Sequence, residues 1–129
     1  MVKLHESLPD VEEGIVQLGH PLASALGFTE EEFVGGPYGS YLWWDGKHLL
    51  VSFVVARRQG VGSFSRFVDK CQELGVPIRV PTPVKAMPEI LNRWGWSTDF
   101  EQHDQDPNEK VEVRDPPAEG PWRRPRRTS

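Results

Sequence analysis

The stretch that decides the fold reads Leu49–Val55 (LLVSFVV), then Arg57–Gly62 (RRQGVG), then an amphipathic segment that runs to Leu74. The first segment is apolar except for Ser52, and such a run is typical of a central strand covered on both faces. In the last segment the apolar residues recur at the spacing of one helix face; they are Phe64, Phe67, Val68, Cys71 and Leu74. The sequence therefore predicts a buried strand, a glycine-containing loop and a helix in direct succession.

A β-hairpin is expected immediately before this stretch. The segment Ser40–Trp44 is rich in aromatic residues, and Asp45-Gly46 follows, which is the strongest short signal for a hairpin turn. The second strand would run over His48–Ala56. Trp43 and Trp44 occupy adjacent strand positions, so one should face each side of the sheet.

The first third of the chain is predicted to hold short helices. Asp10 could cap a helix over Val11–Leu18, and Pro21–Leu26 could form another. Phe28–Val34 is a third candidate, with Thr29 as its cap and acidic residues in its first turn.

After the amphipathic helix, the sequence predicts a short strand over Val76–Val80 and a helix over Pro88–Trp94 that ends at Gly95. A last strand is expected over Trp96–Phe100. Helices, a hairpin, a helix, a strand, a helix and a strand in this order predict an α/β (mixed α+β) fold, with a central mixed β-sheet flanked by helices.

The C-terminal part of the chain differs in composition from the rest. The 129 residues suffice for one domain, which we place at residues 1–103. Residues 104–129 hold six acidic and six basic residues, much proline and little apolar material, so we expect a disordered tail with at most a short strand near Lys110–Arg114. The cluster Trp122–Arg127 could contact phosphate or an acidic protein partner; alternatively, the tail only increases solubility.

Charge and hydropathy limit the partners and the cellular compartment that we expect for this protein. Residues 1–103 carry 13 acidic and 9 basic residues, so a nucleic-acid surface is not expected. The longest apolar run is far shorter than the roughly 20 residues that cross a bilayer. No signal-peptide stretch opens the sequence, and we expect a cytoplasmic protein that does not bind membranes.

The Arg57–Gly62 segment has the composition of an anion site. Glycines let the backbone approach a ligand, and the amides of Gly60, Val61, Gly62 and Ser63 would lie at a helix N-terminus, where phosphate binds well. Arg57 or Arg58 would add a charge-assisted hydrogen bond. The alternative is that the glycines serve only a tight turn between strand and helix.

Other site patterns are not found in the sequence. A Walker loop is absent, and the dinucleotide fingerprint fails at its third glycine, where Ser65 stands. The histidines, His5, His20, His48 and His103, lack metal-ligand spacing, so no metal is expected. Cys71 lies on the apolar helix face and is interpreted as an inert buried thiol. The run Glu30–Glu32 is interpreted as solvated; alternatively, Glu31 or Glu32 could bind or deprotonate an amine.

The order of these features resembles the GNAT acetyltransferase superfamily. The resemblance covers Leu49–Val55, Arg57–Gly62, the helix to Leu74, Pro77–Val80 and Ile90–Trp96. It implies that the loop Arg57–Ser63, with Gln59 included, binds the pyrophosphate of coenzyme A. It also implies that the main chain around Phe53, Val54 and Val55 pairs with the pantetheine, beside a slot where the strand diverges from Pro77–Val80. The co-substrate would be acetyl-CoA or another acyl-CoA.

The implied reaction moves an acyl group to an amine on a small molecule or a protein. The family commonly places a tyrosine acid and an asparagine where this chain has Leu91 and Val84, so no catalytic residue is assigned. A second hypothesis is therefore a non-catalytic accessory or interaction protein on the same fold, such as a viral factor. A third is a nucleotide- or nucleic-acid-contacting module that uses the same turn and the terminal arginines.

Overall fold

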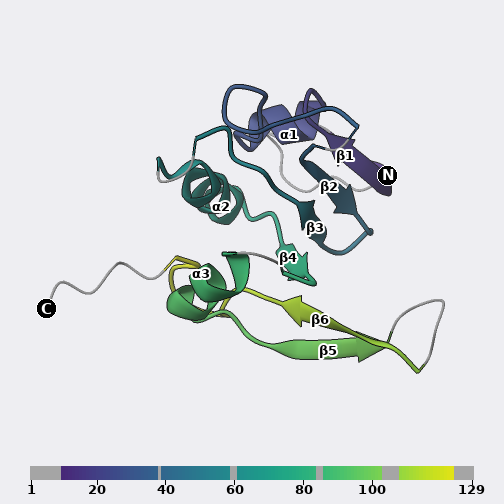
Figure 1. The fold of residues 1–129 in the computed structure, drawn as a ribbon, viewed down its shortest axis with the longest axis vertical. Coiled ribbons are helices and arrows are strands. Elements are labelled where there is room, and N and C mark those ends of the chain that lie inside the picture. Colours follow the sequence, from purple (N-terminus) through teal and green to yellow (C-terminus); the bar gives the residue numbers. More distant parts are fainter. Residues whose placement is uncertain (1–9, 38, 59–60, 84–85, 103–107, 124–129) are drawn as a thin grey trace, which may run out of the picture. The chain divides into compact units, whose positions relative to one another are not determined.

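The chain has an α+β fold with a six-stranded mixed sheet and three helices in the part that the structure describes (Figure 1). The computed structural model describes residues 10–37, 39–58, 61–83, 86–102 and 108–123. Hydrogen-bonded neighbours follow the order β1-β2-β3-β4-β6-β5. The contacts between residues divide the chain into two compact units, residues 1–78 and residues 79–129. Strand β4 spans the boundary between them.

The first unit is built on an antiparallel meander. Its elements are β1 (Gly14–Gln17), α1 (Pro21–Ala25), β2 (Tyr41–Trp44), β3 (Leu49–Phe53) and α2 (Ser63–Glu73). The predicted hairpin is confirmed, with Trp43 opposite Leu50. At its turn, the Asp45 Oδ1 accepts hydrogen bonds from the backbone amides of Lys47, at 2.8 Å, and His48, at 2.6 Å. The predicted helices at Pro21 and after Gly62 are also confirmed.

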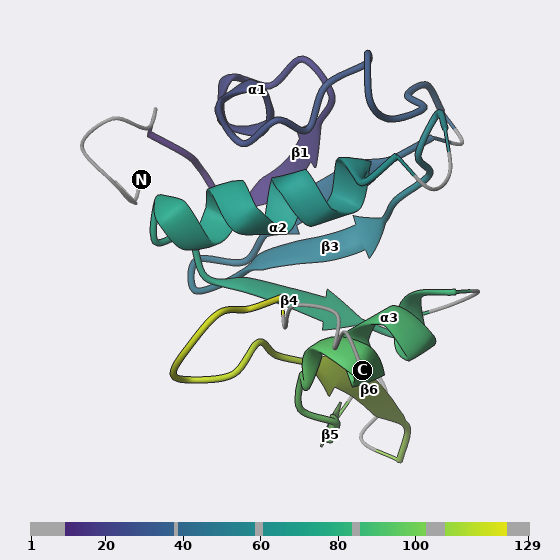
Figure 2. The same cartoon turned by 90° about the vertical axis from the view of Figure 1, so that its left-hand side faces the viewer.

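The core of this unit lies between one sheet face and the two helices. Alternate strand residues point into it, and α2 lies across that face (Figure 2). The fully buried ring of Phe28 packs 4.7 Å from that of Phe33 and 5.4 Å from that of Phe67, measured between centroids. The buried strand residues are Val16, Leu42, Trp44, Leu49 and Val51. The aromatic contacts thus join the 28–33 turn to α2.

The second unit holds the rest of β4 (Ile78–Pro81), α3 (Met87–Trp94), β5 (Asp99–Gln102) and β6 (Lys110–Arg114). Strand β6 pairs antiparallel with both β4 and β5. The buried Arg114 guanidinium donates to the carbonyl oxygen of Ser97, at 2.5 Å, and to the side chain of Asn92. Gly95 ends α3 at φ 80°, as predicted.

Two helix predictions near the N-terminus are wrong. Residues expected to be helical over Val11–Leu18 form β1 instead, because Gly14 adopts φ 136° and the β-branched pair Ile15 and Val16 alternates between exposed and buried. The segment Phe28–Val34 is a turn in which Thr29 O accepts hydrogen bonds from Glu32 N and Phe33 N. It does not continue as a helix, because Phe33 bridges to Ala56.

The disorder predicted for residues 104–129 does not hold for residues 108–123. The strand expected at Lys110–Arg114 is confirmed as β6. Beyond it, the Trp96 Nε1 donates to the carbonyl oxygen of Trp122 at 2.7 Å. Composition failed as a guide because sheet pairing and the buried Arg114 supply contacts that a count of apolar residues does not register. Residues 103–107 and 124–129 lie outside the described part.

Among the described residues, none of the helices is long and apolar enough to span a membrane.

The aromatic contacts of Phe28 yield a stability prediction. Phe28→Ala should lower the free energy of unfolding by about 3–5 kcal/mol, because it empties a fully buried site. Phe100→Ala removes the same ring from a position 61% exposed and should change stability by less than about 0.5 kcal/mol. Urea unfolding of both variants checks this, and equal losses would contradict the packing described.

Candidate functional site

The chain remains paired as it leaves β3 and approaches the 57–62 loop. Val34 N donates to Val55 O at 2.8 Å, and Arg57 N donates to Glu32 O at 2.9 Å. Phe33 and Ala56 form an antiparallel bridge between these two hydrogen bonds. The turn before β2 therefore runs beside the last residues before the loop and brings Glu32 to the same place as Arg57.

Both main-chain polar groups of Val55 form hydrogen bonds within the chain. Its N–H donates to Ser40 Oγ at 2.8 Å, and its carbonyl accepts from that hydroxyl at 3.2 Å as well as from Val34. Of the three residues expected to pair with pantetheine, Val55 therefore already has hydrogen-bond partners within the chain for both of its main-chain groups.

The start of α2 is a glycine in the left-handed conformation, which agrees both with an anion site and with a tight turn between strand and helix. Gly62 is the N-cap residue, at φ 82° and ψ 21°, and no side chain caps the helix. Glycine adopts this left-handed conformation without steric cost. The first intrahelical bond runs from Arg66 N to Gly62 O, at 2.9 Å. The preceding amides of the first turn have no acceptor within the helix backbone, which is the general condition for anion binding at an N-terminus.

A carboxylate of the chain itself lies at this helix terminus. Ser63 Oγ donates to Glu32 Oε2, and Arg66 Nη2 donates to the same oxygen at 2.8 Å. Arg66 is fixed in turn by a 2.6 Å hydrogen bond from its Nη1 to Val61 O. The hydrogen bond from Ser63 has the largest effect and lowers the pKa of Glu32. Desolvation, which comes next, raises this pKa, but the interactions with Arg66 and then Arg58 lower it, so the net shift is downward.

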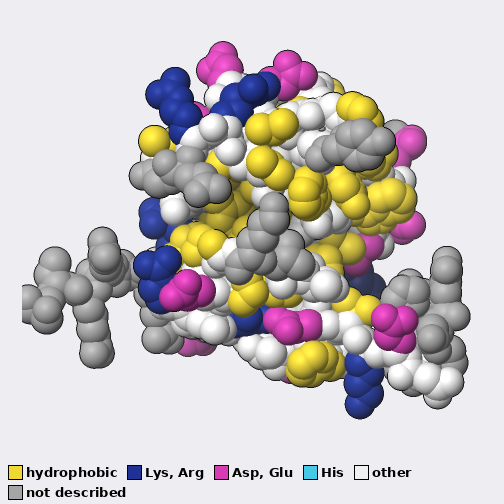
Figure 3. All heavy atoms as spheres, in the orientation of Figure 1, with side chains coloured by type: hydrophobic (Ala, Val, Ile, Leu, Met, Phe, Trp, Pro, Cys, Tyr) yellow, Lys and Arg dark blue, Asp and Glu magenta, His cyan; other side chains and the backbone are white. Residues whose placement is uncertain are grey.

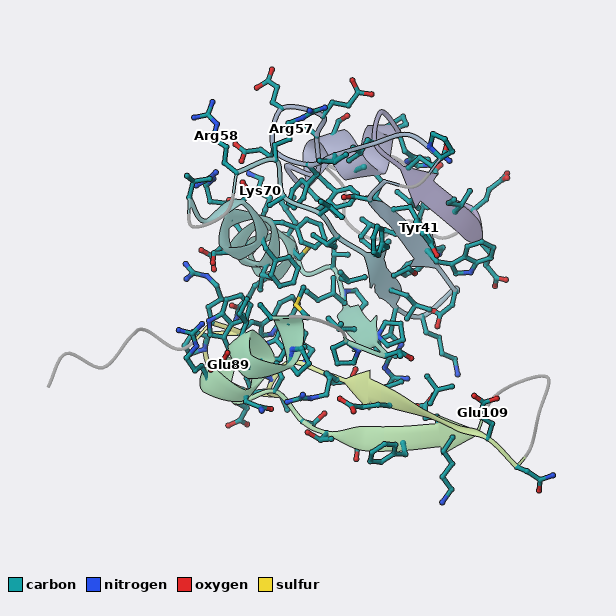
Figure 4. The ribbon with its side chains drawn as sticks, in the orientation of Figure 1. Tyr41, Arg57, Arg58, Lys70, Glu89 and Glu109 are labelled. Atoms are coloured by element: carbon teal, nitrogen blue, oxygen red, sulfur yellow. The ribbon has the colours of Figure 1, made fainter. Side chains whose placement is uncertain are left out.

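A shallow pocket of about 250 Å³ opens at this point. Its lining is charged, with three arginines and two glutamates, and comprises Glu31, Glu32, Arg57, Arg58, Val61, Ser63 and Arg66. Arg57 is oriented by a hydrogen bond from its Nε to Glu30 O, whereas Arg58 extends outward from the loop (Figure 4). A second pocket of about 370 Å³ shares Glu31, Glu32, Ser63 and Arg66 and continues toward α1 and Lys70.

The structure brings together most of the residues that the sequence nominated. Arg57 and Arg58 line the pocket with Val61 and the buried Ser63, and Gly62 adjoins them. Phe53, Val54 and Val55 are half-buried and lead into the loop. Gln59 and Gly60, also nominated, lie outside the described residues.

Sequence reasoning missed the pairing of Arg66 with Glu32. The spacing of Arg66, three residues after Ser63, places both on one helix face and could have suggested that Arg66 joins the site. Glu32 comes from 31 residues earlier than Ser63, and no local pattern signals that contact.

The remaining candidates have structural roles. Cys71 is fully buried, and desolvation raises the pKa of its thiol well above the ordinary value. His20 Nδ1 accepts a hydrogen bond from Leu22 N at 3.0 Å and so caps α1. Within the described ranges, no three histidine, cysteine or acidic side chains come together as a metal site.

No protein-family model, curated protein sequence or solved structure matches this chain. The resemblance to the GNAT superfamily therefore rests on the residues quoted above.

The lowered pKa of Glu32 makes its contribution to stability dependent on pH. A folded-state pKa below the ordinary 4.5 means that the native state favours the ionised carboxylate. The stabilisation is thus fully present above that value and is lost as the pH falls through the folded-state pKa. The unfolding free energy of wild type should exceed that of Glu32→Gln at neutral pH, and the difference should shrink on acidification.

Urea unfolding across this pH range provides the measurement. Glu12→Gln, which removes an exposed carboxylate from the same unit, controls for a general change in net charge. A wild-type advantage over Glu32→Gln that stays constant down to the acid limit would refute the pairing of Glu32 with Ser63 and Arg66.

Proposed function

We propose that this chain is a GNAT-like N-acyltransferase, which binds an acyl-CoA through the Arg57–Ser63 loop and transfers the acyl group to an amine. The observation that supports this proposal is the start of α2. A left-handed Gly62 without a side-chain cap stands at a pocket lined by Arg57 and Arg58. The pyrophosphate of coenzyme A is the part of the ligand that this end of the helix would hold.

The electrostatics of the pocket favour a phosphate ligand over a cationic one. Arg66 forms an ion pair with Glu32. The remaining basic residues of the lining, Arg57 and Arg58, outnumber Glu31 and provide the positive charge that a pyrophosphate would meet. The N-terminal dipole of α2 adds the equivalent of about half a positive charge. A pyrophosphate beside the Glu32–Arg66 pair would accept hydrogen bonds from the first-turn amides and from both arginines.

In the proposed reaction, the role of the loop is to position the acyl-CoA. The amine nitrogen attacks the thioester carbonyl, a C–N bond forms, and the C–S bond breaks to release the CoA thiolate. One proton leaves the amine and one is taken up by the thiolate. The main chain around Phe53 and Val54 would orient the pantetheine, as the resemblance implies. Glu32 is a poor general base, because its lowered pKa weakens its affinity for a proton.

A second candidate function is that of a non-catalytic protein with the same fold. The identity of residue Leu91 favours it. This residue stands where the family places its tyrosine acid, and it is 0% exposed in the core. A leucine side chain cannot protonate a thiolate. If Leu91 marks the loss of catalysis, acyl-CoA would bind without amine-dependent release of the thiol.

Thermal unfolding with acetyl-CoA tests the proposed site. Ligand at one hundred times its dissociation constant should stabilise the fold by about 2.7 kcal/mol, which is several degrees for a chain of this size. Arg58→Ala should raise the dissociation constant about tenfold, because it removes one charge-assisted hydrogen bond. ATP and NAD serve as ligand controls.

Lys47→Ala is the matched control variant, since it removes one exposed cation from the hairpin turn of the same unit. It should bind acetyl-CoA as wild type does. Absence of any acetyl-CoA shift from folded protein, or equal losses in both variants, would reject the proposal. Thiol release in the presence of a panel of amines then separates the enzyme from the non-catalytic candidate.

A further inference from the structure

The carboxylate of Glu32 accepts hydrogen bonds from two side chains at the start of α2. Ser63 Oγ and Arg66 Nη2 both donate to its Oε2, the second over 2.8 Å. Ser63 is the first residue of the helix, and Arg66 belongs to the same turn. Hydroxyl and guanidinium donors bind phosphate as well as carboxylate. Glu32 therefore engages two groups that a phosphate at this helix terminus would otherwise bind.

The main chain of Glu32 is held in place on both sides. Its N–H donates to Thr29 O at 3.1 Å, and its carbonyl accepts from Arg57 N at 2.9 Å. The next residue, Phe33, is fully buried and forms the bridge to Ala56. The carboxylate therefore stays within reach of α2 unless the turn itself rearranges.

The other charged groups that line the two pockets with Glu32 are mostly basic. They are Arg57 and Arg58 from the loop, Arg66 and Lys70 from α2, and Glu31 from the turn itself. Figure 3 shows basic and acidic side chains close together at this end of the first unit, where Figure 4 labels Arg57 and Arg58. Glu32 is thus a carboxylate placed directly on two donors of a largely basic surface.

We propose that Glu32 competes with the ligand at this site: its carboxylate withholds Ser63 and Arg66 from the pyrophosphate of an acyl-CoA and repels that group, so the site binds more tightly once the charge of Glu32 is removed. This inference rests on the proposed function, since it concerns the regulation of the same site. A pyrophosphate still binds through the first-turn amides, Arg57 and Arg58, but without the two further donors of α2.

Protonation of Glu32 has the same effect as removal of its charge. A bound pyrophosphate disfavours a neighbouring carboxylate, so it should raise the pKa of Glu32 relative to the ligand-free protein. Binding and protonation then favour each other, because coupling between two sites is reciprocal. In the ligand-free protein, the hydrogen bond from Ser63 is the largest of the effects that hold this pKa below the ordinary 4.5. Glu32 is therefore ionised at neutral pH, and the site is in its weaker-binding state.

Isothermal titration calorimetry with acetyl-CoA at neutral pH tests the competition. Glu32→Gln keeps the shape of the side chain and removes its charge, so it should lower the dissociation constant about fivefold. Glu30→Gln is the matched control, because it removes the same charge from an exposed residue of the same turn that does not line the pocket. The control should change the dissociation constant by less than about twofold.

Inorganic pyrophosphate, as a second probe, separates this inference from the proposed function. It carries the phosphate groups without the pantetheine. If acetyl-CoA binds none of the three proteins but Glu32→Gln tightens the binding of pyrophosphate, the acyl-CoA proposal fails and the competing carboxylate stands. Equal dissociation constants for wild type and Glu32→Gln with both ligands, an equal gain from Glu30→Gln, or no binding of either ligand would overturn the inference.

A measurement on wild type alone serves if Glu32→Gln fails to fold. The carboxyl carbon of Glu32 is followed by ¹³C NMR as the pH falls, with and without saturating acetyl-CoA. The bound ligand should move the titration midpoint of Glu32 to higher pH, because it disfavours the ionised form. A midpoint that the ligand leaves unchanged, or moves to lower pH, contradicts the competition.

Discussion

The hydrogen bond from Ser63 to the Glu32 carboxylate joins the turn before β2 to the first residue of α2. Arg66 completes this contact with a 2.8 Å ion pair. The Phe33–Ala56 bridge holds the same turn beside the residues that follow β3, and the ring of Phe33 packs against the ring of Phe28. The 57–62 loop therefore begins and ends at positions set by long-range contacts, and the pocket depends on them.

The position of Glu32 also bears on how a phosphate ligand would bind. A carboxylate at a helix N-terminus is favourable to the dipole, so Glu32 stabilises the start of α2 when no ligand is bound. A pyrophosphate must share the first turn with it. Arg66 makes this feasible because it forms an ion pair with Glu32, while Arg57 and Arg58 also line the pocket. Glu32 and Arg66 thus shape the site, whereas Arg57 and Arg58 would contact the ligand.

The central part of the fold could be predicted because its signals are local. The Asp45-Gly46 turn, the apolar period of α2 and the glycine at its N-terminus each act through neighbouring residues, and the structure agrees. The helix prediction over Val11–Leu18 failed because Gly14 and the pair Ile15 and Val16 form a strand only by pairing with β2. Strand β6 likewise depends on partners distant in sequence. The 57–62 loop could be predicted as an anion site from its own glycines, because that signal is local. The Glu32–Arg66 pair could not be predicted, because its two residues lie far apart in the sequence.

The measurement that tests this account most directly is the response of the backbone amides to acetyl-CoA, followed by ¹H–¹⁵N NMR. The account predicts that the largest changes fall on Val61, Gly62 and Ser63, at the start of α2, with a smaller response at Glu32. ATP at the same concentration provides the comparison for nonspecific phosphate binding. Changes confined to residues outside the pocket, or no changes in a well-dispersed spectrum, would contradict the assignment of this loop as an acyl-CoA site.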